Sequence, residues 1–240
     1  MARKRAPLTR ERVLRAALAL ADAGGHEALS MRNLGKQLGV EAMSLYNHVA
    51  NKEDILDGLV DIVFSEIEVP EPGEVDWKAA LRRRAISVRA ALNRHRWAVG
   101  LMEGRMSPGP ANLRNHNAVM GCLRESGFSF QDAVHAYSVM DAYIYGFALQ
   151  ERDLPFDAPE EVAAVQDAKQ RNAPDMTAYP YLVEIFTEMA TAGYDFETEF
   201  EFGLDLILDA LERSRGRAAR SARAGRSAEG TAARSRRRSA

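Results

Sequence analysis

The 240-residue sequence contains a single cysteine, Cys122, which excludes a disulfide within the chain and a zinc site built from several cysteines. Cys122 lies next to Leu123 and two positions after Met120, in a stretch with helical spacing of apolar residues. We therefore interpret it as a buried thiol, and the alternative is a reactive one.

Long apolar runs are also missing, although hydrophobic residues make up 46% of the chain. No run approaches the roughly 20 residues that a membrane-spanning helix needs. The first residues, Met-Ala-Arg-Lys-Arg, are followed by polar sequence and not by the apolar core of a signal peptide. We expect a globular protein that works in the cytoplasm and has no membrane partner.

Motifs that carry catalysis are absent from the sequence. It has no Gly-rich phosphate loop, no Gly-x-Ser-x-Gly turn and no His-Glu-x-x-His pair. The acidic pair Glu160-Glu161 lies in polar sequence typical of a solvated loop. The sequence therefore predicts no enzyme, no metal site and no cofactor.

Patterns typical of β-strands are missing too, because no five-residue stretch alternates apolar and polar residues between turn signals. Apolar residues instead recur every three or four positions, which predicts an all-α fold. Apart from the segment discussed next, helices are expected at about residues 9–23, 52–68, 77–101, 111–126, 129–151, 179–192 and 196–213. Residues 152–178 are expected to form a loop with at most one short helix.

Residues 30–52 carry the most specific pattern. Ser30 is a good cap for a helix of about two turns, and Gly39 supplies the left-handed conformation that ends it. The next helix, with Val40 and Leu45 facing inward, is too short to be stable alone. Two short helices joined by a glycine turn are typical of a helix-turn-helix DNA reader, although an ordinary helical hairpin has the same pattern. The side chains left for an outer surface are Ala42, Met43, Ser44, Asn47 and His48.

Charge is divided unevenly and favours the DNA interpretation. Residues 1–52 hold nine Lys and Arg against four Asp and Glu, a net of +5, whereas residues 53–213 hold 14 against 29, a net of −15. A basic head on an acidic body indicates where nucleic acid would bind. From Ser214 onward the chain has nine Arg and one Glu with no large apolar residue, which predicts a disordered tail over 214–240. The tail either adds phosphate attraction or is a solvated extension with no specific role.

Several tracts resemble the tetracycline-repressor (TetR) family. They are Leu34-Gly-Lys-Gln-Leu-Gly-Val, Leu45-Tyr-Asn-His-Val and Asn51-Lys-Glu-Asp-Ile-Leu in the DNA-binding region, and Asp76-Trp-Lys, Glu125-Ser-Gly-Phe-Ser and Tyr145-Gly-Phe in the regulatory region. The resemblance covers about residues 8–212. It implies a homodimer in which each third helix enters the major groove, and a small molecule in the larger domain that moves the two heads apart.

The DNA-binding candidates combine the outer surface with the family's matched positions. They are Ser30, Arg32, Ala42, Met43, Ser44, Tyr46, Asn47, His48 and Lys52. Arg32 and Asn47 are suited to base edges, while Ala42 and Met43 offer only apolar contacts. Lys52, at the positive end of the next helix, is placed to meet a phosphate.

The sequence departs from the resemblance in the drug pocket. Met102 stands where the tetracycline repressor has a histidine that helps to hold a magnesium–drug chelate, Glu68 falls near a second pocket histidine, and Arg84 replaces a polar amide. A thioether is a poor ligand for Mg²⁺, which prefers oxygen. We therefore do not expect tetracycline–magnesium to be the inducer.

A different pocket is expected in the same domain. Its ligand-binding candidates are Val88, Met102, Arg105, Leu113, His116, Asn117, Met120, Tyr137, Asp141, Tyr145 and Gln150. The alternative is that the apolar members, with Val99, are plain core and that the histidine is structural. Arg105 and the aromatic residues favour an amphipathic organic ligand.

These observations predict four parts. They are a helix-turn-helix DNA-binding domain at 1–52 with a basic arm at 1–8, a connecting helix at 53–69, a helical ligand-binding and dimerisation domain at 70–213, and the tail at 214–240. The apolar faces of helices 130–151 and 196–213 would pair with a second copy as a four-helix bundle. The predicted function is a repressor released from a palindromic operator by a small organic ligand. The alternative is a DNA-binding protein controlled by a protein partner or with an architectural role.

Overall fold

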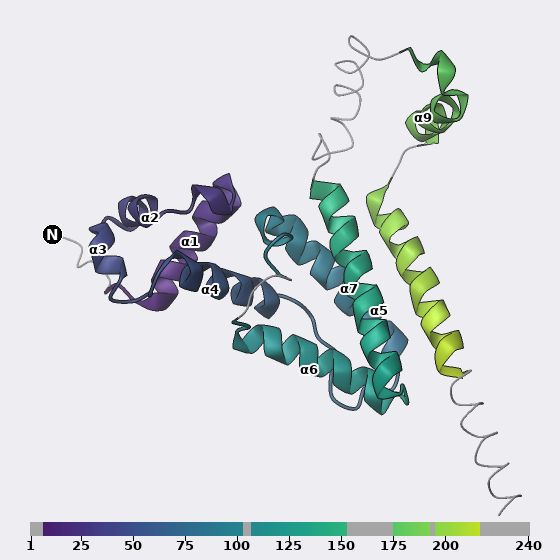
Figure 1. Cartoon of the computed structure of the whole chain (residues 1–240), viewed down its shortest axis with the longest axis horizontal. Helices are drawn as coiled ribbons and strands as arrows, with labels where there is room; N and C mark the ends of the chain where they lie inside the picture. The colour runs from purple at the N-terminus through teal and green to yellow at the C-terminus, as the bar shows by residue number, and fades with distance from the viewer. Residues whose placement is uncertain (1–6, 103–106, 153–174, 193–194, 217–240) are drawn as a thin grey trace, which may run out of the picture.

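The computed structural model describes residues 7–102, 107–152, 175–192 and 195–216. Within these ranges the secondary structure is helical and no strand occurs, which confirms the all-α prediction. Helices α1 to α3 form a head at one end, α4 leads out of it, and α5, α6 and α7 lie together in the body (Figure 1).

The head begins where local capping predicts it. Helix α1 covers Arg10–Gly24, and the Thr9 side chain accepts a hydrogen bond from the Arg12 backbone N at 3.2 Å. Helix α2 covers Met31–Leu38, capped by Ser30, whose Oγ accepts from the Asn33 backbone N at 3.1 Å. Each such cap stabilises its helix by about 1 kcal/mol.

The turn after α2 is the one that the sequence predicts. Gly39 ends α2 at φ 66° and ψ 38°, the left-handed region that a side chain would disfavour. The next helix, α3, covers only Ala42–Leu45. Leu45 is fully buried and anchors α3 in the core that α1 and α4 share. Tertiary packing, and not helix propensity, therefore holds α3 in place.

Helix α4, Lys52–Ser65, joins the head to the body. Asn51 caps it by accepting from the Asp54 backbone N at 2.8 Å, and buried apolar residues run along its whole length. The helix ends at Ser65, three residues before the expected end at Glu68, and a loop leads to α5.

Helix α5, Trp77–Arg94, is shorter than the predicted helix at 77–101. His95 leaves the helical conformation at φ −119° and ψ 60°, and a short 3₁₀ turn, η2, follows at Arg96–Ala98. The buried His95 ring lies between two carboxylates, Asp22 of α1 and Glu66, and these long-range contacts override the helical pattern. Helices α6, Pro110–Glu125, and α7, Phe130–Arg152, agree with the prediction within one residue.

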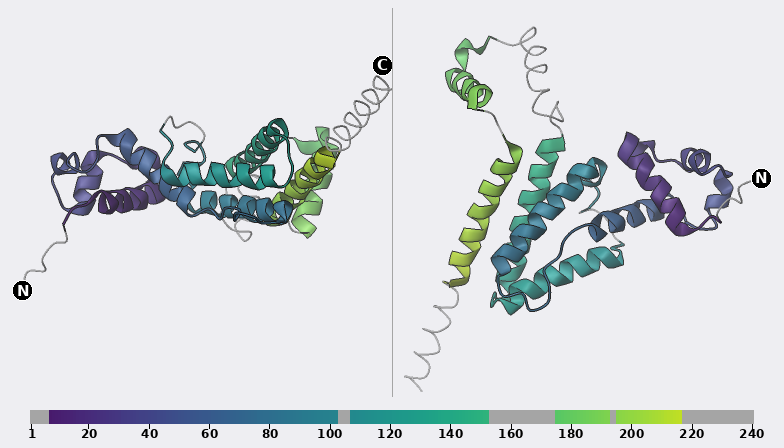
Figure 2. Two further views of the ribbon diagram at one scale, coloured as in Figure 1. Left: turned by 90° about the horizontal axis from the view of Figure 1, so that it is seen from below. Right: turned by 180° about the vertical axis from the view of Figure 1, so that it is seen from behind.

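The last described helix covers residues 196–216 and packs beside α7 (Figures 1 and 2). Phe200, Leu204 and Leu208 form its buried face, and the Tyr143 ring of α7 stacks on Phe200 with centroids 5.5 Å apart. Complete burial of one such side chain contributes about 1.5–3 kcal/mol.

The prediction of a disordered tail from Ser214 was wrong for its first three residues. The helix continues through residue 216 because Arg215 packs against the body. Its guanidinium lies over the rings of Trp77 and Phe128, 5.5 and 5.8 Å from their centroids, and donates to the Ser126 carbonyl oxygen at 2.9 Å. Residues 217–240 lie outside the described part of the chain.

Helix α9, Pro180–Ala192, follows the 3₁₀ turn η3, Met176–Ala178, and stands away from the body (Figure 2). Tyr181 is 77% exposed and Ile185 52% exposed. The loop expected at 152–178 falls mostly on residues 153–174, outside the described part. None of the described helices is long and apolar enough to cross a membrane.

Candidate DNA interface and ligand site

Most of the predicted DNA-binding residues lie on α3 and in the turn that follows it, and Arg32 lies on α2. Met43 is 75% exposed and Tyr46 47% exposed. Arg32 and Asn47 are also exposed, while Ala42, Ser44 and His48 are partly buried. This surface lies at the end of the molecule farthest from the helix at 196–216 (Figure 1). A short helix with an apolar inner side and this mixed outer side can enter a DNA groove.

Two further DNA-binding candidates sit at helix starts. The Ser30 Oγ accepts from the Asn33 backbone N and so acts first as the cap of α2. Lys52 is the first residue of α4 and is partly exposed. Such a helix start attracts a phosphate oxygen.

An ion pair fixes the start of α4 against α1. Arg10 donates through Nη1 and Nη2 to the two oxygens of Asp54 at 2.8 and 2.7 Å, and Asp54 also accepts from the Ala50 backbone N at 2.8 Å. The hydrogen bonds from Arg10 hold the pKa of Asp54 below its ordinary value. The clamp therefore orients the segment that carries Lys52.

Gly35 is a functional position that the sequence interpretation missed. A Cβ atom there would lie 2.9 Å from the Val40 carbonyl oxygen and 3.2 Å from the Ala42 backbone N. Only glycine permits this close approach of α3 to α2. Its signal in the sequence is a glycine within a helical pattern, which marks either a weak helix or a close packing contact.

In the body, two predicted ligand-binding residues meet a buried arginine. Arg84 of α5 is only 1% exposed, and its Nη1 donates to Asp141 Oδ1 at 2.9 Å. Its Nε donates to Asn115 Oδ1 of α6 at 3.1 Å, and its guanidinium lies 5.7 Å from the centre of the Tyr137 ring. We name Arg84, Asn115, Tyr137 and Asp141 the polar cluster.

The polar cluster leaves hydrogen-bonding capacity unused. Arg84 Nη2 and Asn115 Nδ2 are buried and lack a hydrogen-bond partner within the described residues, whereas the Tyr137 hydroxyl has the Asp141 carboxylate as a neighbour. A buried polar atom without a partner costs about 1–3 kcal/mol, and several together mark a place where a ligand or water completes the network.

Charge within the polar cluster is balanced. Burial by itself lowers the pKa of Arg84, but the Asp141 carboxylate overrides it, so that the pKa lies above its ordinary value. Burial also raises the pKa of Tyr137, and the nearby Asp141 raises it further, so the hydroxyl keeps its proton. The cluster thus offers N–H and O–H donors together with one carboxylate acceptor.

The other ligand-binding candidates are spread over different environments. Val88 and Met102 are buried, while His116, Met120 and Tyr145 are partly buried. The His116 ring lies 5.1 Å from the Tyr137 ring, and its Nδ1 donates to the Asn112 carbonyl oxygen at 3.0 Å. Leu113, Asn117 and Gln150 point to the surface of this chain, because the helical period turns them away from the core. Arg105 lies outside the described residues.

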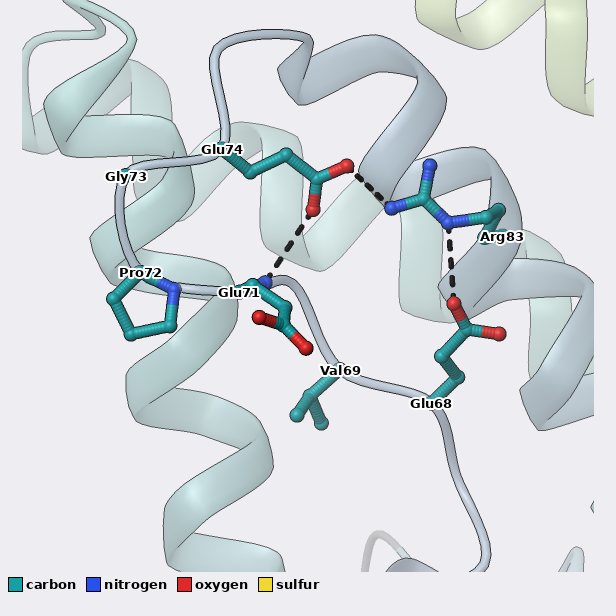
Figure 3. A pocket seen from close by; sticks show the side chains of 7 residues that line it. All are labelled: Glu68, Val69, Glu71, Pro72, Gly73, Glu74 and Arg83. Carbon is teal, nitrogen blue, oxygen red and sulfur yellow. Dashed lines mark hydrogen bonds and ion pairs between the residues drawn. The ribbon is translucent and has the colours of Figure 1, made fainter.

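Glu68 belongs to a separate surface hollow of about 500 Å³ (Figure 3). Arg83 Nε donates to Glu68 Oε1 at 3.1 Å, and Arg83 also pairs with Glu74, whose pKa this contact lowers. Three carboxylates, those of Glu68, Glu71 and Glu74, face one guanidinium in this hollow, so it is acidic overall and differs from the charge-balanced polar cluster. Over the described ranges, no group of three or more His, Cys, Asp or Glu side chains is arranged to hold a metal ion.

Two carboxylates connect the head and α4 to the body. Asp61 Oδ1 of α4 accepts from the backbone N atoms of Ala111 and Asn112 at 2.8 and 3.0 Å, which seats the start of α6 on α4. Asp22 Oδ1 of α1 accepts from Trp97 Nε1 at 2.7 Å and lies 2.7 Å from His95 Nδ1. The start of α6 is thus bonded to α4, and η2 is bonded to α1 of the head.

Cys122 of α6 is buried, which confirms the prediction for this residue. Burial raises the pKa of its thiol to about 11, so the reactive thiolate is scarce at neutral pH.

The helical fold and the short exposed helix define a DNA-binding regulator with a separate sensing body. Residues 13–59 match the family of bacterial regulatory proteins described as the tetR family, and residues 69–215 match the tetracyclin repressor-like C-terminal domain. The chain belongs to the TetR family of transcriptional regulators.

Relatives of known role support this assignment. The HTH-type transcriptional repressor DrrR1 of Streptomyces coeruleorubidus is 33% identical, covering 85% of this chain and 77% of the relative. The class A tetracycline repressor protein of Escherichia coli is 34% identical over 85% and 90% of the two chains. The crystal structure of ActR from Streptomyces coelicolor with actinorhodin aligns with a TM-score of 0.70 at 32% identity, over 88% of this chain and 100% of that one.

Proposed function

We propose that this chain is a homodimeric repressor that binds a palindromic operator through α3. A small organic molecule that binds in the body, between α5, α6 and α7, releases the repressor from the operator. The observation that carries the proposal is α3 itself, a four-residue helix anchored by one buried leucine, Leu45, on a basic head. DNA-facing roles are proposed for Arg32 of α2, for Tyr46 and Asn47 in the turn after α3, and for Lys52 at a phosphate. The remaining candidates, Ser30, Ala42, Met43, Ser44 and His48, support or border these contacts.

Exposed apolar side chains support the dimer. Val139 of α7 is 50% exposed, and Phe202 and Leu206 of the helix at 196–216 are 63% and 54% exposed. Apolar residues on two neighbouring helices fit a four-helix bundle formed with a second copy. The change Phe202→Glu should give a monomer in sedimentation at micromolar concentration, whereas Val75→Glu, at a 94% exposed loop position, should stay a dimer.

Ligand control is proposed to act through the polar cluster. Asn115 lies on α6, whose start is hydrogen-bonded to Asp61 of α4. A ligand that engages Asn115 and Arg84 would favour a position of α6 that changes the spacing of the two heads. Reciprocity then requires operator DNA to weaken ligand binding by the same factor.

The proposal predicts stabilisation by an inducer in a thermal-shift screen of organic compounds. A compound at 100 times its dissociation constant stabilises the folded state by about 2.7 kcal/mol. If the protein binds an operator but no compound in the screen stabilises it, the alternative is favoured. The chain would then be a DNA-binding protein that is controlled by a protein partner or that has an architectural role. The proposed function has no catalytic step, and it places the protein in the cytoplasm with its operator.

A further inference from the structure

A buried histidine lies where the head meets the body. His95 follows the last residue of α5, and it is only 6% exposed. Its Nδ1 lies 2.7 Å from Oδ1 of Asp22, which belongs to α1 of the head. Its Nε2 lies 3.2 and 3.3 Å from the two oxygens of Glu66, the residue that follows α4. One imidazole ring therefore contacts carboxylates from two separate elements.

The two carboxylates require a hydrogen on each ring nitrogen. An ionised carboxylate only accepts hydrogen bonds, whereas a neutral imidazole has one N–H group and one lone pair. A neutral His95 ring can donate to Asp22 or to Glu66, and its other nitrogen then turns a lone pair toward a carboxylate oxygen. Only the imidazolium form donates to both. The two contacts therefore depend on one titratable proton.

Glu66 has a second cation as a partner. Arg94 of α5 donates through Nε and Nη2 to Glu66 Oε2 at 3.2 and 2.8 Å. Burial by itself raises the pKa of Glu66, but the hydrogen bonds from Arg94 and His95 outweigh it and hold this pKa below its ordinary value. Glu66 is therefore ionised at neutral pH and keeps Arg94 as its partner in either state of His95.

Asp22 depends on His95 alone for its charge balance. Its Oδ1 also accepts from Trp97 Nε1 of η2 at 2.7 Å, but this indole is uncharged, and its ring lies 6.2 Å from the His95 ring. Among the described residues, His95 is the one cationic side chain within ion-pairing distance of Asp22. The charge of Asp22 is therefore balanced only while His95 carries its proton.

Loss of this proton weakens the contact between the body and the head. A hydrogen bond between ionised partners is roughly twice as strong as one between neutral partners. The neutral ring keeps at most one of its two hydrogen bonds, and its burial limits replacement of the other by water. Because Glu66 keeps Arg94, the loss of charge acts mainly on Asp22 and so on α1.

We propose that His95 is a proton-operated latch between the body and the head. The protonated ring ties Asp22 of α1 to Glu66 after α4, and the neutral ring lets the head move over a wider range. The latch rests on the proposed binding of operator DNA through the head. It adds a control that needs no organic ligand, because operator affinity falls as the pH rises and His95 loses its proton.

The pH dependence of operator affinity tests the latch on the full-length chain. Fluorescence anisotropy with labelled operator, from about pH 6 to about pH 9, spans the range in which histidines usually titrate. The comparison is with His95→Gln, whose amide has a donor and an acceptor, as the neutral ring has, but never a positive charge. Across this range the wild-type affinity should fall about fivefold more than that of His95→Gln. Equal pH profiles of the two proteins overturn the proposal.

Another histidine provides the matched control. His135 is exposed on α7, and His135→Gln should keep the wild-type profile. His48, on the proposed DNA surface, is present in all three proteins, so the difference between the profiles isolates His95. If His135→Gln changes the profile as much as His95→Gln does, the assignment to His95 is wrong.

Nitrogen NMR of the wild-type imidazole rings measures the latch without DNA and without a variant. Both nitrogens of His95 should carry hydrogen at about pH 6, and one of them should lose it by about pH 9. A ring that stays in one state over this range overturns the proposal.

A second variant keeps the test decisive if His95→Gln does not fold. Asp22→Asn preserves the shape of the side chain and an oxygen acceptor for Trp97, but it removes the charge that His95 balances. Its pH profile should be flatter than that of the wild type. A wild-type profile in Asp22→Asn contradicts the latch.

The two measurements separate failure of the latch from failure of the proposed function. Operator binding with the same pH profile in the wild type and in His95→Gln retains the repressor and removes the latch. If the His95 ring titrates as expected but the protein binds no operator at any pH, the proposed function is lost, and the control of DNA binding with it.

Discussion

Trp97 Nε1 donates a hydrogen bond to Asp22 Oδ1 at 2.7 Å, and this contact joins η2 of the body to α1 of the head. The same carboxylate oxygen lies 2.7 Å from His95 Nδ1, and His95 Nε2 lies 3.2 Å from Glu66 Oε1. The head is thus held from two directions, through α4 and through Asp22. A second attachment restricts how far the head can swing about α4.

The variant Trp97→Phe tests this attachment, because it keeps an aromatic ring and removes only the N–H donor. Loss of a hydrogen bond to a carboxylate should cost about 1–2 kcal/mol. A head with a wider range of positions should bind operator about fivefold more weakly, with an unchanged salt dependence. Fluorescence anisotropy with labelled operator measures both quantities. Trp77→Phe, away from the head, is the matched control, and equal operator affinity of Trp97→Phe and wild type would contradict the restraint.

Substitution of Lys52 should separate phosphate contacts from base contacts. Lys52→Ala removes one cation at the start of α4, so the slope of log affinity against log salt should fall by about one unit for every DNA sequence. Arg32→Ala should weaken binding and also change the preferred sequence if the guanidinium reaches a base. Anisotropy titrations at four salt concentrations give the slopes, and an unchanged slope for Lys52→Ala would exclude its phosphate contact.

Substitution of Gly35 should disable DNA binding without unfolding the body. Gly35→Ala places a Cβ atom 2.9 Å from the Val40 carbonyl oxygen, which must move and take α3 with it. The expected cost is about 1–3 kcal/mol, with loss of operator binding. Gly121→Ala is the control, since nothing lies within 4 Å of its Cβ and alanine favours the middle of α6. Circular dichroism measures whether the variant is folded, and fluorescence anisotropy measures its operator affinity. If Gly35→Ala binds operator as tightly as the wild-type protein does, this packing is contradicted.

Acid should loosen the head through Asp54. Arg10 holds the pKa of Asp54 below its ordinary value of 3.8, so the stabilisation is complete above that pH and is lost as the pH falls through the lowered pKa. Asp54→Asn should therefore lower the melting temperature at pH 7 and remove part of the decline below pH 4. The contribution of this partly exposed pair is about 1 kcal/mol. Thermal melts of the wild-type protein and of Asp54→Asn from pH 2.5 to 7 measure this contribution. If the melting temperatures of the two proteins depend on pH in the same way, the Arg10–Asp54 pair does not stabilise the head.

Local signals in the sequence were sufficient for the head. Ser30, Gly39 and Asn51 act within three or four residues of their own positions, so a cap or a glycine turn can be recognised without knowing the fold. Leu45 is buried as its spacing predicts. The starts of α1, α2 and α4 follow from the same short-range chemistry.

Long-range contacts could not be read in this way. Arg84 and Asp141 are separated by 57 positions, and nothing near either residue in the sequence indicates the ion pair. Arg215 looks like part of an Arg-rich tail until Trp77 and Phe128 are placed beneath it. The early end of α5 also depends on a distant residue, since the His95 ring lies against Asp22. The polar cluster is built from such contacts, which explains why Tyr137 and Asp141 were candidates from the sequence while Asn115 was not.

Footprinting of the full-length chain on DNA selected from a random-sequence pool shows whether two copies of α3 bind one operator together. We expect one protected region with two-fold sequence symmetry, with half-site centres on the order of 34–36 Å apart, about one helical turn. Protection of a single non-repeated sequence, or of no specific sequence, would contradict a dimer that reads DNA through two copies of α3.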